Sequence, residues 1–243
     1  MTIGEKAFSG CYNLSSVGIS DKVKIIENEA FAYCRGLTSV IIPNSVTSIG
    51  NLAFYDCRSL TSITIPNSVQ SIGNGAFQNC KNLTSVNILS GVTSIGEVAF
   101  EGCSSLTSIT IPNSVSSIGR GAFEDCSSLT SISIPNSVSS IGGSAFNETP
   151  WYNNQPDGLV YAGKMVYQYK GDMPQGTNIV INEGTLGIAS WAFMNRSGLN
   201  SIVIPNSIKS IGESAFAGCS SLTSITIPNS VKNIGSSAFL NCI

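Results

Sequence analysis

The sequence predicts a β-rich α/β solenoid, in which short repeats stack to form a shared core, and three observations predict it. Every phenylalanine follows an alanine, and within each block these pairs are 23 residues apart. Every cysteine stands three residues after such a phenylalanine, and six of the nine prolines lie in Ile-Pro-Asn triplets. A fixed period of this length is typical of proteins in which each repeat contacts only its neighbours. The phenylalanines are Phe8, Phe31, Phe54, Phe77, Phe100, Phe123, Phe146, Phe193, Phe216 and Phe239.

Each repeat, called a rung below, begins with a predicted strand. In the rung that starts at Cys57, Leu60, Ile63 and Ile65 form the pattern L-x-x-I-x-I, with hydroxyl side chains between the last aliphatic residues. This alternation predicts a short, half-buried strand. Pro66 cannot donate a hydrogen bond to a sheet, so we expect the strand to end there and the chain to turn.

The rest of the rung predicts a second extended piece and one helical turn. Val69 and Ile72 mark the extended piece, which Gly73 ends. Ala76, Phe77 and Cys80 have the spacing i, i+1, i+4, which is compatible with about one helical turn facing inward. Eight inward residues per rung cannot form a core alone, but copies stacked about 4.8 Å apart can.

The segment "CRSLTSITIPNSVQSIGNGAF", from Cys57 to Phe77, resembles the 23-residue leucine-rich repeats of the BspA-like type. The Pro, Gly, Ala-Phe and Cys positions all agree, and the resemblance covers nearly the whole chain. It implies a right-handed solenoid with a concave parallel sheet. It also implies a cell-surface or secreted protein of a host-associated microbe, with adhesion to host or neighbouring cells as the usual role.

We expect residues 1–243 to form a single solenoid of about ten recognisable turns, with a hairpin insertion at residues 150–178. Both ends of the chain lie in the middle of a repeat and lack clear caps, so we expect it to be part of a longer protein. From Phe146 to Phe193 the step is 47 residues, which exceeds 23 by 24. Within this stretch, "LVYAGKMVYQY" predicts two strands joined at residues 162–164.

The insertion is rich in aromatic residues, and two interpretations of them remain open. Trp151, Tyr161, Tyr167 and Tyr169 could cover a break in the solenoid core, a role that hairpin insertions in BspA-like proteins favour. Alternatively, they form an exposed patch that recognises a protein or a glycan, since Tyr and Trp are enriched in binding surfaces. Strand periodicity allows the three tyrosines to share a face.

No constellation of residues predicts catalysis, a metal site or a cofactor. Histidine is absent, which excludes Ser-His-Asp and Cys-His arrangements and His-based zinc motifs. The cysteines form no C-x-x-C pair, so we interpret them as free, buried packing residues. The "GNG" at Gly73 and "GRG" at Gly119 recur with the repeat and are interpreted as turns rather than phosphate loops. We therefore expect a protein that is not an enzyme.

Charge also excludes several partners. Charged residues make up 11% of the chain and the net charge is -2, so neither nucleic acid nor an anionic membrane is an expected partner. No apolar run approaches the roughly 20 residues of a membrane span. A small acidic group could hold a cation weakly, but a solvated edge is the simpler interpretation. Its members are Glu97, Glu101, Glu124 and Asp125.

The outward hydroxyls of the strands fall into two columns. The first is uniform serine, as at Ser62 and Ser85, and we expect neighbouring hydroxyls in it to pair across strands. The second column varies from rung to rung, so it is the better candidate for contact with a partner. It contains Ile41, Thr64, Asn87, Thr110, Ser133, Val203 and Thr226.

Two functions are compatible with these columns. The first is a non-catalytic adhesion module that binds a protein or glycan on host or neighbouring cells through the concave face and the aromatic hairpin. The second is a passive stalk that spaces another domain from the cell surface, which the near-identity of the repeats favours. Ice or crystal-lattice binding fits less well, because Ile41 and Val203 interrupt the outward Ser/Thr array.

Overall fold

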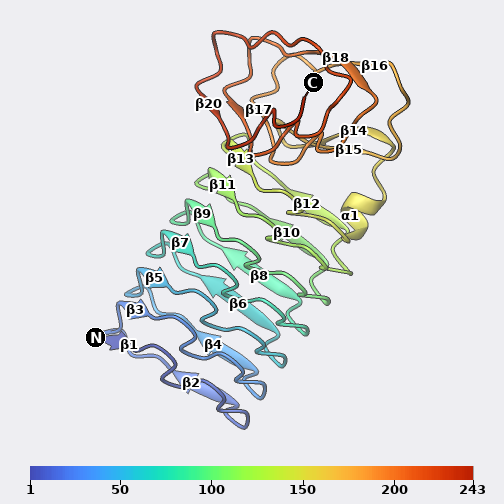
Figure 1. Ribbon diagram of the computed structural model, residues 1–243. Helices are drawn as coiled ribbons and strands as arrows, with labels where there is room; N and C mark the ends of the chain where they lie inside the picture. Colours follow the sequence, from blue (N-terminus) through green and yellow to red (C-terminus); the bar gives the residue numbers. More distant parts are fainter. Residues whose placement is uncertain (243) are drawn as a thin grey trace. The chain divides into compact units, whose positions relative to one another are not determined.

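The computed structural model describes residues Met1–Cys242 and contains two compact units. The N-terminal unit comprises Met1–Ser137 and Ser144–Asn154. The C-terminal unit comprises Val138–Gly143 and the chain from Gln155 onward. Both are built of stacked, parallel β-coils (Figure 1), so the predicted parallel β-solenoid is confirmed. A single solenoid over the whole chain stays a prediction.

Each rung of the N-terminal unit contributes one longer strand to the first face of the stack. These strands pair in parallel and in register, so that Ser62 lies opposite Ser85 and Thr64 opposite Asn87. The pairing joins them two at a time, as β2–β4, β6–β8 and β10–β12. The strands are β2 (Ser16–Gly18), β4 (Ser39–Ile41), β6 (Ser62–Ile65), β8 (Ser85–Ile88), β10 (Ser108–Thr110) and β12 (Ser131–Ser133).

A second ladder of shorter strands lies at the opposite corner of each rung, where Val69 and Ile72 mark the predicted second extended piece. These strands pair in parallel in the order β1-β3-β5-β7-β9-β11. Isoleucine meets isoleucine along the ladder, as Ile72 does Ile95. The strands are β1 (Thr2–Ile3), β3 (Ile25–Ile26), β5 (Ser48–Ile49), β7 (Ser71–Ile72), β9 (Ser94–Ile95) and β11 (Ser117–Ile118).

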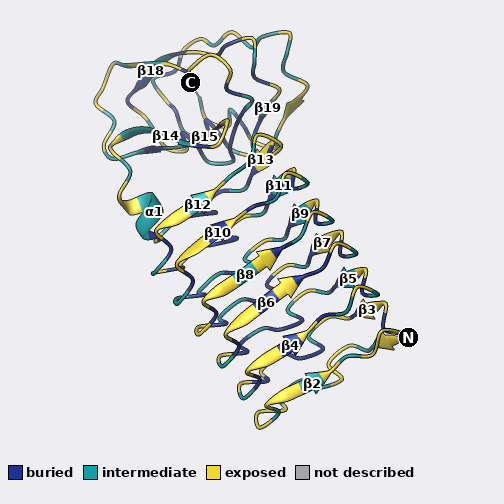
Figure 2. Cartoon of the chain, turned by 180° about the vertical axis from the view of Figure 1, so that it is seen from behind, coloured by how far each residue is buried: buried dark blue, intermediate teal, exposed yellow. Residues whose placement is uncertain are grey.

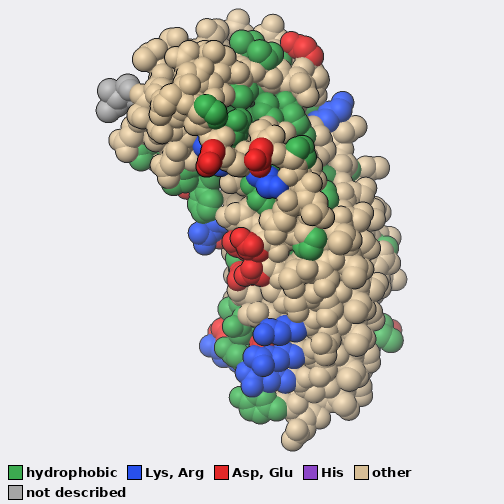
Figure 3. Space-filling model, turned by 90° about the vertical axis from the view of Figure 1, so that its right-hand side faces the viewer, with side chains coloured by type: hydrophobic (Ala, Val, Ile, Leu, Met, Phe, Trp, Pro, Cys, Tyr) green, Lys and Arg blue, Asp and Glu red, His purple; other side chains and the backbone are tan. Residues whose placement is uncertain are grey.

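The core runs along the axis of the stack between the two ladders (Figure 2). Leu60, Ile63 and Ile65 are all buried, as the strand pattern predicts. The phenylalanine rings stack nearly parallel from rung to rung; those of Phe77 and Phe100 have centroids 5.3 Å apart and planes 7° apart. On the face seen in Figure 3, apolar and charged side chains cover only part of the surface, and the rest is backbone and other side chains, consistent with the Ser, Thr, Asn and Gly content.

The predicted helical turn around Ala76, Phe77 and Cys80 is wrong, although these three side chains are buried. In the equivalent segment one rung earlier, Leu52 and Asp56 have positive φ, 56° and 57°, which no α-helix contains. Backbone N–H groups there alternate in direction. The amide of Phe54 donates to the carbonyl of Ala76 on the next rung (2.8 Å), whereas that of Tyr55 closes a local turn on Leu52 (3.0 Å).

The C-terminal unit begins around the predicted hairpin. Strands β14 (Gly158–Ala162) and β15 (Met165–Lys170) are antiparallel and joined by Gly163 and Lys164. Strand β15 also pairs in parallel with β17, so it replaces one strand of the short ladder, in the order β14-β15-β17-β19-β20. The unit also contains β13 (Ser140–Ile141), β16 (Thr177–Val180), β17 (Gly187–Ile188), β18 (Leu199–Val203), β19 (Ser210–Ile211) and β20 (Asn233–Ile234).

The phenylalanine stack predicts a position-dependent loss of stability. Phe100 is fully buried between two rings, whereas Phe8 is half-buried and stacks on Phe31 alone among the described rings. We expect Phe100→Ala to lower the free energy of unfolding by about 3–5 kcal/mol and Phe8→Ala by clearly less, because only the former leaves a closed cavity. Urea unfolding followed by circular dichroism measures both. Equal losses would contradict a stack in which interior rings carry most of the packing.

Candidate binding surface

The outward side chains of the longer strands form an exposed face on the N-terminal unit. The second, variable column is exposed at each of its predicted positions in this unit, and Ile41 is 82% exposed. Such a large apolar side chain gains nothing from folding in this position. The column in this unit runs through Ile41, Thr64, Asn87, Thr110 and Ser133.

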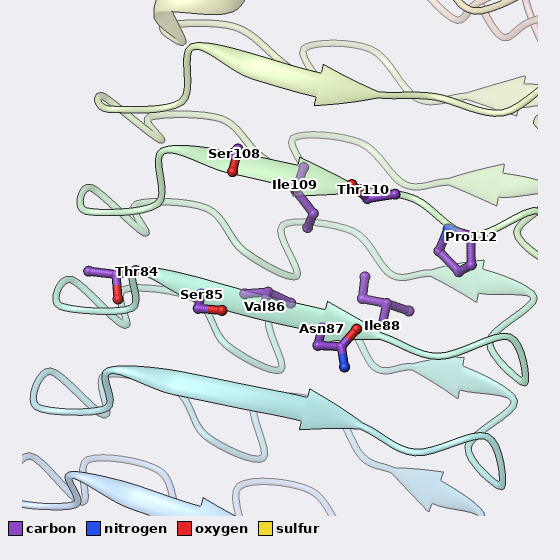
Figure 4. Close-up of a pocket in the computed structure, with 9 residues that line it drawn as sticks. All are labelled: Thr84, Ser85, Val86, Asn87, Ile88, Ser108, Ile109, Thr110 and Pro112. Carbon is purple, nitrogen blue, oxygen red and sulfur yellow. The ribbon is translucent and has the colours of Figure 1, made fainter.

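Two open grooves lie on this face, at the places where strand pairing is interrupted. A groove of about 330 Å³ lies between β8 and β10, which are not paired with each other, and Asn87 and Thr110 line it (Figure 4). A second, of about 290 Å³, lies between β4 and β6, and Ile41 and Thr64 line it. The variable column therefore supplies side chains to both grooves. No sequence signal indicated that the ladder would be interrupted there.

The uniform serine column does not behave as predicted. Within the described residues, Ser62 and Ser85 lie opposite each other but donate no hydrogen bond to one another. In-register parallel strands point equivalent side chains the same way from backbones about 4.8 Å apart, which is too far for short hydroxyls to meet. The bonds between rungs come instead from threonines one residue earlier: Thr84 Oγ1 donates to the carbonyl of Thr61 at 3.1 Å.

The C-terminal unit presents the same column differently. Val203, at the end of β18, is 56% exposed and pairs in register with the exposed Val180. Thr226 is exposed but lies outside any strand. Here a serine of the first column does bond across strands, because Ser201 donates to the side-chain oxygen of Asn178 at 2.5 Å.

The aromatic residues of the insertion lie mostly inside. Tyr167 and Tyr169 are 1% and 9% exposed. The hairpin register shifts between Val160 and Tyr161, so that Tyr161 pairs with Val166 and Tyr167 has no residue opposite it. Tyr161 packs against the core that contains Tyr169, and its hydroxyl accepts a hydrogen bond from the amide of Asn182. These positions fit the interpretation in which aromatics cover a break in the core.

The half-buried Trp151 has the same role in the N-terminal unit. It lies edge-on to Phe146, with ring centroids 5.2 Å apart, and its amide donates to the carbonyl of Leu129. It belongs to the short helix α1 (Pro150–Asn153), whose N-cap is Thr149. Trp151 thus covers the last ring of the phenylalanine stack in this unit.

The cysteines form a ladder of free thiols. Each inner thiol donates to the carbonyl of the phenylalanine on the preceding rung, as Cys80 Sγ does to Phe54 at 3.2 Å. A thiol is a weak donor, and its short side chain reaches this carbonyl without disturbing the packing. The predicted burial holds for the inner rungs, whereas Cys11 is exposed and Cys242 is partly buried.

The cysteine position changes where the repeat breaks. Thr149 stands there in one rung, and its hydroxyl donates to the carbonyl of Phe146 at 2.6 Å. Arg196 stands there in the rung of Phe193, and its guanidinium donates to the carbonyl of Tyr169 at 2.6 Å. Tyr169 therefore takes the place of a phenylalanine, since its amide also donates to Ala192 as a phenylalanine amide does to the next rung.

The remaining candidates from the sequence are structural. A Cβ added at Gly73 would lie 2.5 Å from the carbonyl group of Gly50, so this glycine allows close approach of two turns. Burial, followed by the charge of Asp125, raises the pKa of Glu101; burial and then Glu101 raise that of Glu124. Residues 1–242 contain neither a metal-binding group of His, Cys, Asp or Glu nor a helix long and apolar enough to cross a membrane.

The stacked rungs, the Ile-Pro-Asn triplets and the ladder of phenylalanines and cysteines agree with a known repeat. The sequence model of the BspA type leucine-rich repeat region matches in six copies, over residues 1–104, 47–155 and 164–243. The chain belongs to this family. No curated protein sequence matches it.

Solved structures of bacterial leucine-rich repeat proteins are similar to this BspA-type chain. One, a leucine-rich repeat protein from Bacteroides ovatus, is 27% identical with a TM-score of 0.65, covering all of this chain and 74% of its own. Another is described as a leucine-rich cell surface protein from Faecalibacterium prausnitzii. It is 30% identical with a TM-score of 0.52, covering 90% of this chain and 75% of its own.

The thiol ladder predicts a loss of stability at alkaline pH. Burial raises the pKa of Cys34 to about 11 and that of Cys126 to about 12, and it raises those of Cys80 and Cys103 well above the ordinary value. Well below a pH of about 8.5 the thiols are protonated in both the folded and the unfolded chain, so the raised pKa values do not affect the free energy of unfolding there. Above it the unfolded chain releases protons that the folded chain keeps, so stability falls as the pH rises from about 9 to 11, by about 1.4 kcal/mol per pH unit for each such thiol.

Urea midpoints at pH 7.5, 9 and 10 under reducing conditions measure this slope. The double variant Cys80→Ala, Cys103→Ala is the control, because it removes two of the titrating thiols and should flatten the decline. An identical slope in the variant would show that tyrosine or lysine ionisation, rather than the thiols, sets the pH dependence.

Proposed function

We propose that this chain is a non-catalytic protein-interaction module of a cell-surface or secreted protein, and that it binds a host or surface macromolecule through the strand face of the N-terminal unit. The observation that carries the proposal is the coincidence of the variable column with the two grooves. Ile41 and Thr64 line one groove, and Asn87 and Thr110 line the other. The repeat family and the cell surface protein from Faecalibacterium prausnitzii support the class of function and the location.

The chemistry of the face favours a partner recognised by hydrogen bonds and shape. Ser85, Asn87, Ser108 and Thr110 offer hydroxyl and amide groups along neighbouring rungs. No charged side chain lines either groove in the described part of the chain, so electrostatic steering contributes little to encounter. Exposed Ile41 adds an apolar contact. A polar, uncharged and extended surface suits a protein or a neutral glycan better than nucleic acid.

The aromatic hairpin contributes less than its composition indicates. Tyr167 and Tyr169 are buried, and the half-buried Trp151 packs on Phe146, so the buried tyrosines offer no ring face to a partner and Trp151 only part of its ring. Tyr161 is the most available of the four aromatic residues predicted as candidates, since it lines an open groove with Lys164. The proposed surface therefore keeps the strand column and leaves the buried tyrosines out.

A triple substitution tests the proposed surface. We expect Thr64→Lys, Asn87→Lys and Thr110→Lys together to lower the binding of the labelled protein to epithelial monolayers or immobilised matrix extract at least tenfold, because three long cations fill both grooves. The matched control is Thr47→Lys, Gln70→Lys and Ser116→Lys, which adds the same charge beside the short ladder.

The outcome separates the two functions. If the control binds like the unaltered chain and the groove variant does not, the strand face is the contact surface. If both variants bind like the unaltered chain, the contact lies elsewhere. If the unaltered chain shows no retention above an unrelated protein, the stalk function, which the near-identical rungs favour, replaces this proposal.

A further inference from the structure

An ion cluster lies on a different edge of the N-terminal unit, at the residues that follow the cysteines. The carboxylate of Asp56 is only 5% exposed and accepts two hydrogen bonds at once. Its Oδ2 accepts from Nε of Arg35 at 2.8 Å, and its Oδ1 accepts from Nε of Arg58 at 2.7 Å. One buried acid therefore holds two guanidinium groups of adjacent rungs side by side.

This arrangement leaves the outer ends of both guanidinium groups available. Each arginine uses Nε on Asp56, and within residues 1–242 no acceptor engages the terminal Nη atoms of Arg35 or Arg58. The two side chains are 45% and 49% exposed. A guanidinium has donors on both edges of its fork, so these ends present parallel N–H groups to the solvent.

The cluster carries an excess of positive charge. Two cations share one carboxylate, and Lys81 occupies the same position in the next rung. The hydrogen bond and charge of Asp56 hold the pKa of Arg58 above its ordinary value, so the group stays charged. Like charges at neighbouring rungs repel, and a bound anion would relieve that repulsion.

The solenoid itself does not require these cations. The same position holds Ser104 and Ser127 in later, otherwise near-identical rungs, which form the same turn and the same thiol ladder. Burying the carboxylate of Asp56 also costs desolvation free energy, and a rung without such a buried ion pair avoids that cost. Arg35, Asp56 and Arg58 are therefore an addition to the fold, and their geometry is that of a preformed oxyanion site.

The surroundings favour one compact anion over a long polyanion. Glu101, Glu124 and Asp125 lie further along the same edge, and Figure 3 shows acidic side chains gathered beyond the basic ones. A polyanion extended along the rungs would meet these acids within the screening length of about 8 Å at physiological salt. A single carboxylate on the arginines avoids them.

Tyrosine rings border the cluster and indicate what carries the carboxylate. The guanidinium of Arg35 lies 5.6 Å from the ring centre of Tyr12 and 5.9 Å from that of Tyr33. These rings are 57% and 37% exposed, and Tyr55 packs edge-on to Tyr33 at 5.1 Å. Aromatic surface beside an anion site suits a ligand with a ring that carries C–H groups, which stack on tyrosine.

We propose that Arg35 and Arg58, held by Asp56 and bordered by Tyr12 and Tyr33, bind the carboxylate of an acidic sugar residue. Each guanidinium donates from its outer edge to one carboxylate oxygen, and the sugar ring lies over the tyrosines. This site lies on a different edge from the strand face. An experiment that rules out sugar binding here therefore leaves the proposed interaction surface untouched, and the reverse also holds.

Titration of the 243-residue chain followed by NMR tests the site with four probes. Methyl β-glucuronide is the acidic sugar, and methyl β-glucoside differs from it only in carrying a neutral hydroxymethyl group in place of the carboxylate. Acetate provides the anion alone, and N-acetyl-glutamate amide provides a peptide carboxylate. We expect the glucuronide to bind at least tenfold more tightly than each of the other three at low salt.

Variants separate a built site from general charge attraction. Arg35→Gln and Arg58→Gln should each weaken glucuronide binding at least tenfold, whereas Lys24→Gln, which removes an exposed charge beside β3, should change it less than twofold. Asp56→Asn makes the cluster more positive yet should also weaken binding, because the guanidinium groups lose their common anchor. Circular dichroism checks its fold, and the arginine variants carry the test if it unfolds.

Three results would overturn the proposal. Glucuronide affinity unchanged by both arginine variants would show that the site lies elsewhere. Tighter binding by Asp56→Asn would show that net charge alone attracts the anion. Acetate or the glutamate derivative binding as tightly as the glucuronide would remove the assignment to a sugar and leave a simple carboxylate or acidic-peptide site.

Discussion

The structure depends on backbone hydrogen bonds between residues that occupy the same place in successive rungs. Strand residues pair in register 23 positions apart, as Ser62 does with Ser85. In the turn that contains phenylalanine, every second amide reaches the next rung, as that of Phe54 reaches Ala76. Because both corners of the rung are bonded in this way, identical side chains must stack on one another. The phenylalanine column, the thiol ladder and the hydroxyl columns all follow from that single constraint.

Periodicity made much of this predictable from the sequence. It placed the strand residues, the proline at the strand end and the buried phenylalanines, and its break located the insertion at residues 150–178, within which the structure forms the hairpin of β14 and β15. The helical turn was wrong because i, i+1, i+4 spacing also suits a chain that alternates between right- and left-handed conformations. A usable signal was present two residues after phenylalanine, where Gly10, Asn79 and Asp125 have positive φ. These residue types tolerate that conformation best.

Features that depend on side chains from different columns were not predictable. Arg35 and Asp56 are 21 residues apart, which differs from the 23-residue period. Aligning the repeats therefore places them in different columns, and nothing in the sequence indicates that they form a pair. Strand pairing is absent between β8 and β10, and this gap decides where the groove lies. The residues of these two rungs do not differ from the others in a way that predicts it. By contrast, the two exceptions in the cysteine column, Thr149 and Arg196, mark both sides of the hairpin break. Arg196 donates to the carbonyl of Tyr169 on the preceding rung, as a thiol would, whereas Thr149 donates to Phe146 within its own rung.

The in-register ladders also constrain how such a protein changes in length. An insertion that is not a whole rung moves every later residue out of its column, unless an irregular segment restores the register. The hairpin is such a segment, because its Val166 pairs with Ile188 at a separation of 22 residues instead of 23. Gain or loss of a complete 23-residue repeat keeps the strand ladders, the phenylalanine stack and the thiol ladder in register. Near-identical repeats recombine readily in DNA, so unequal crossing-over can alter the number of rungs in one step. The gene can thereby vary the reach of its product while conserving its stability per rung.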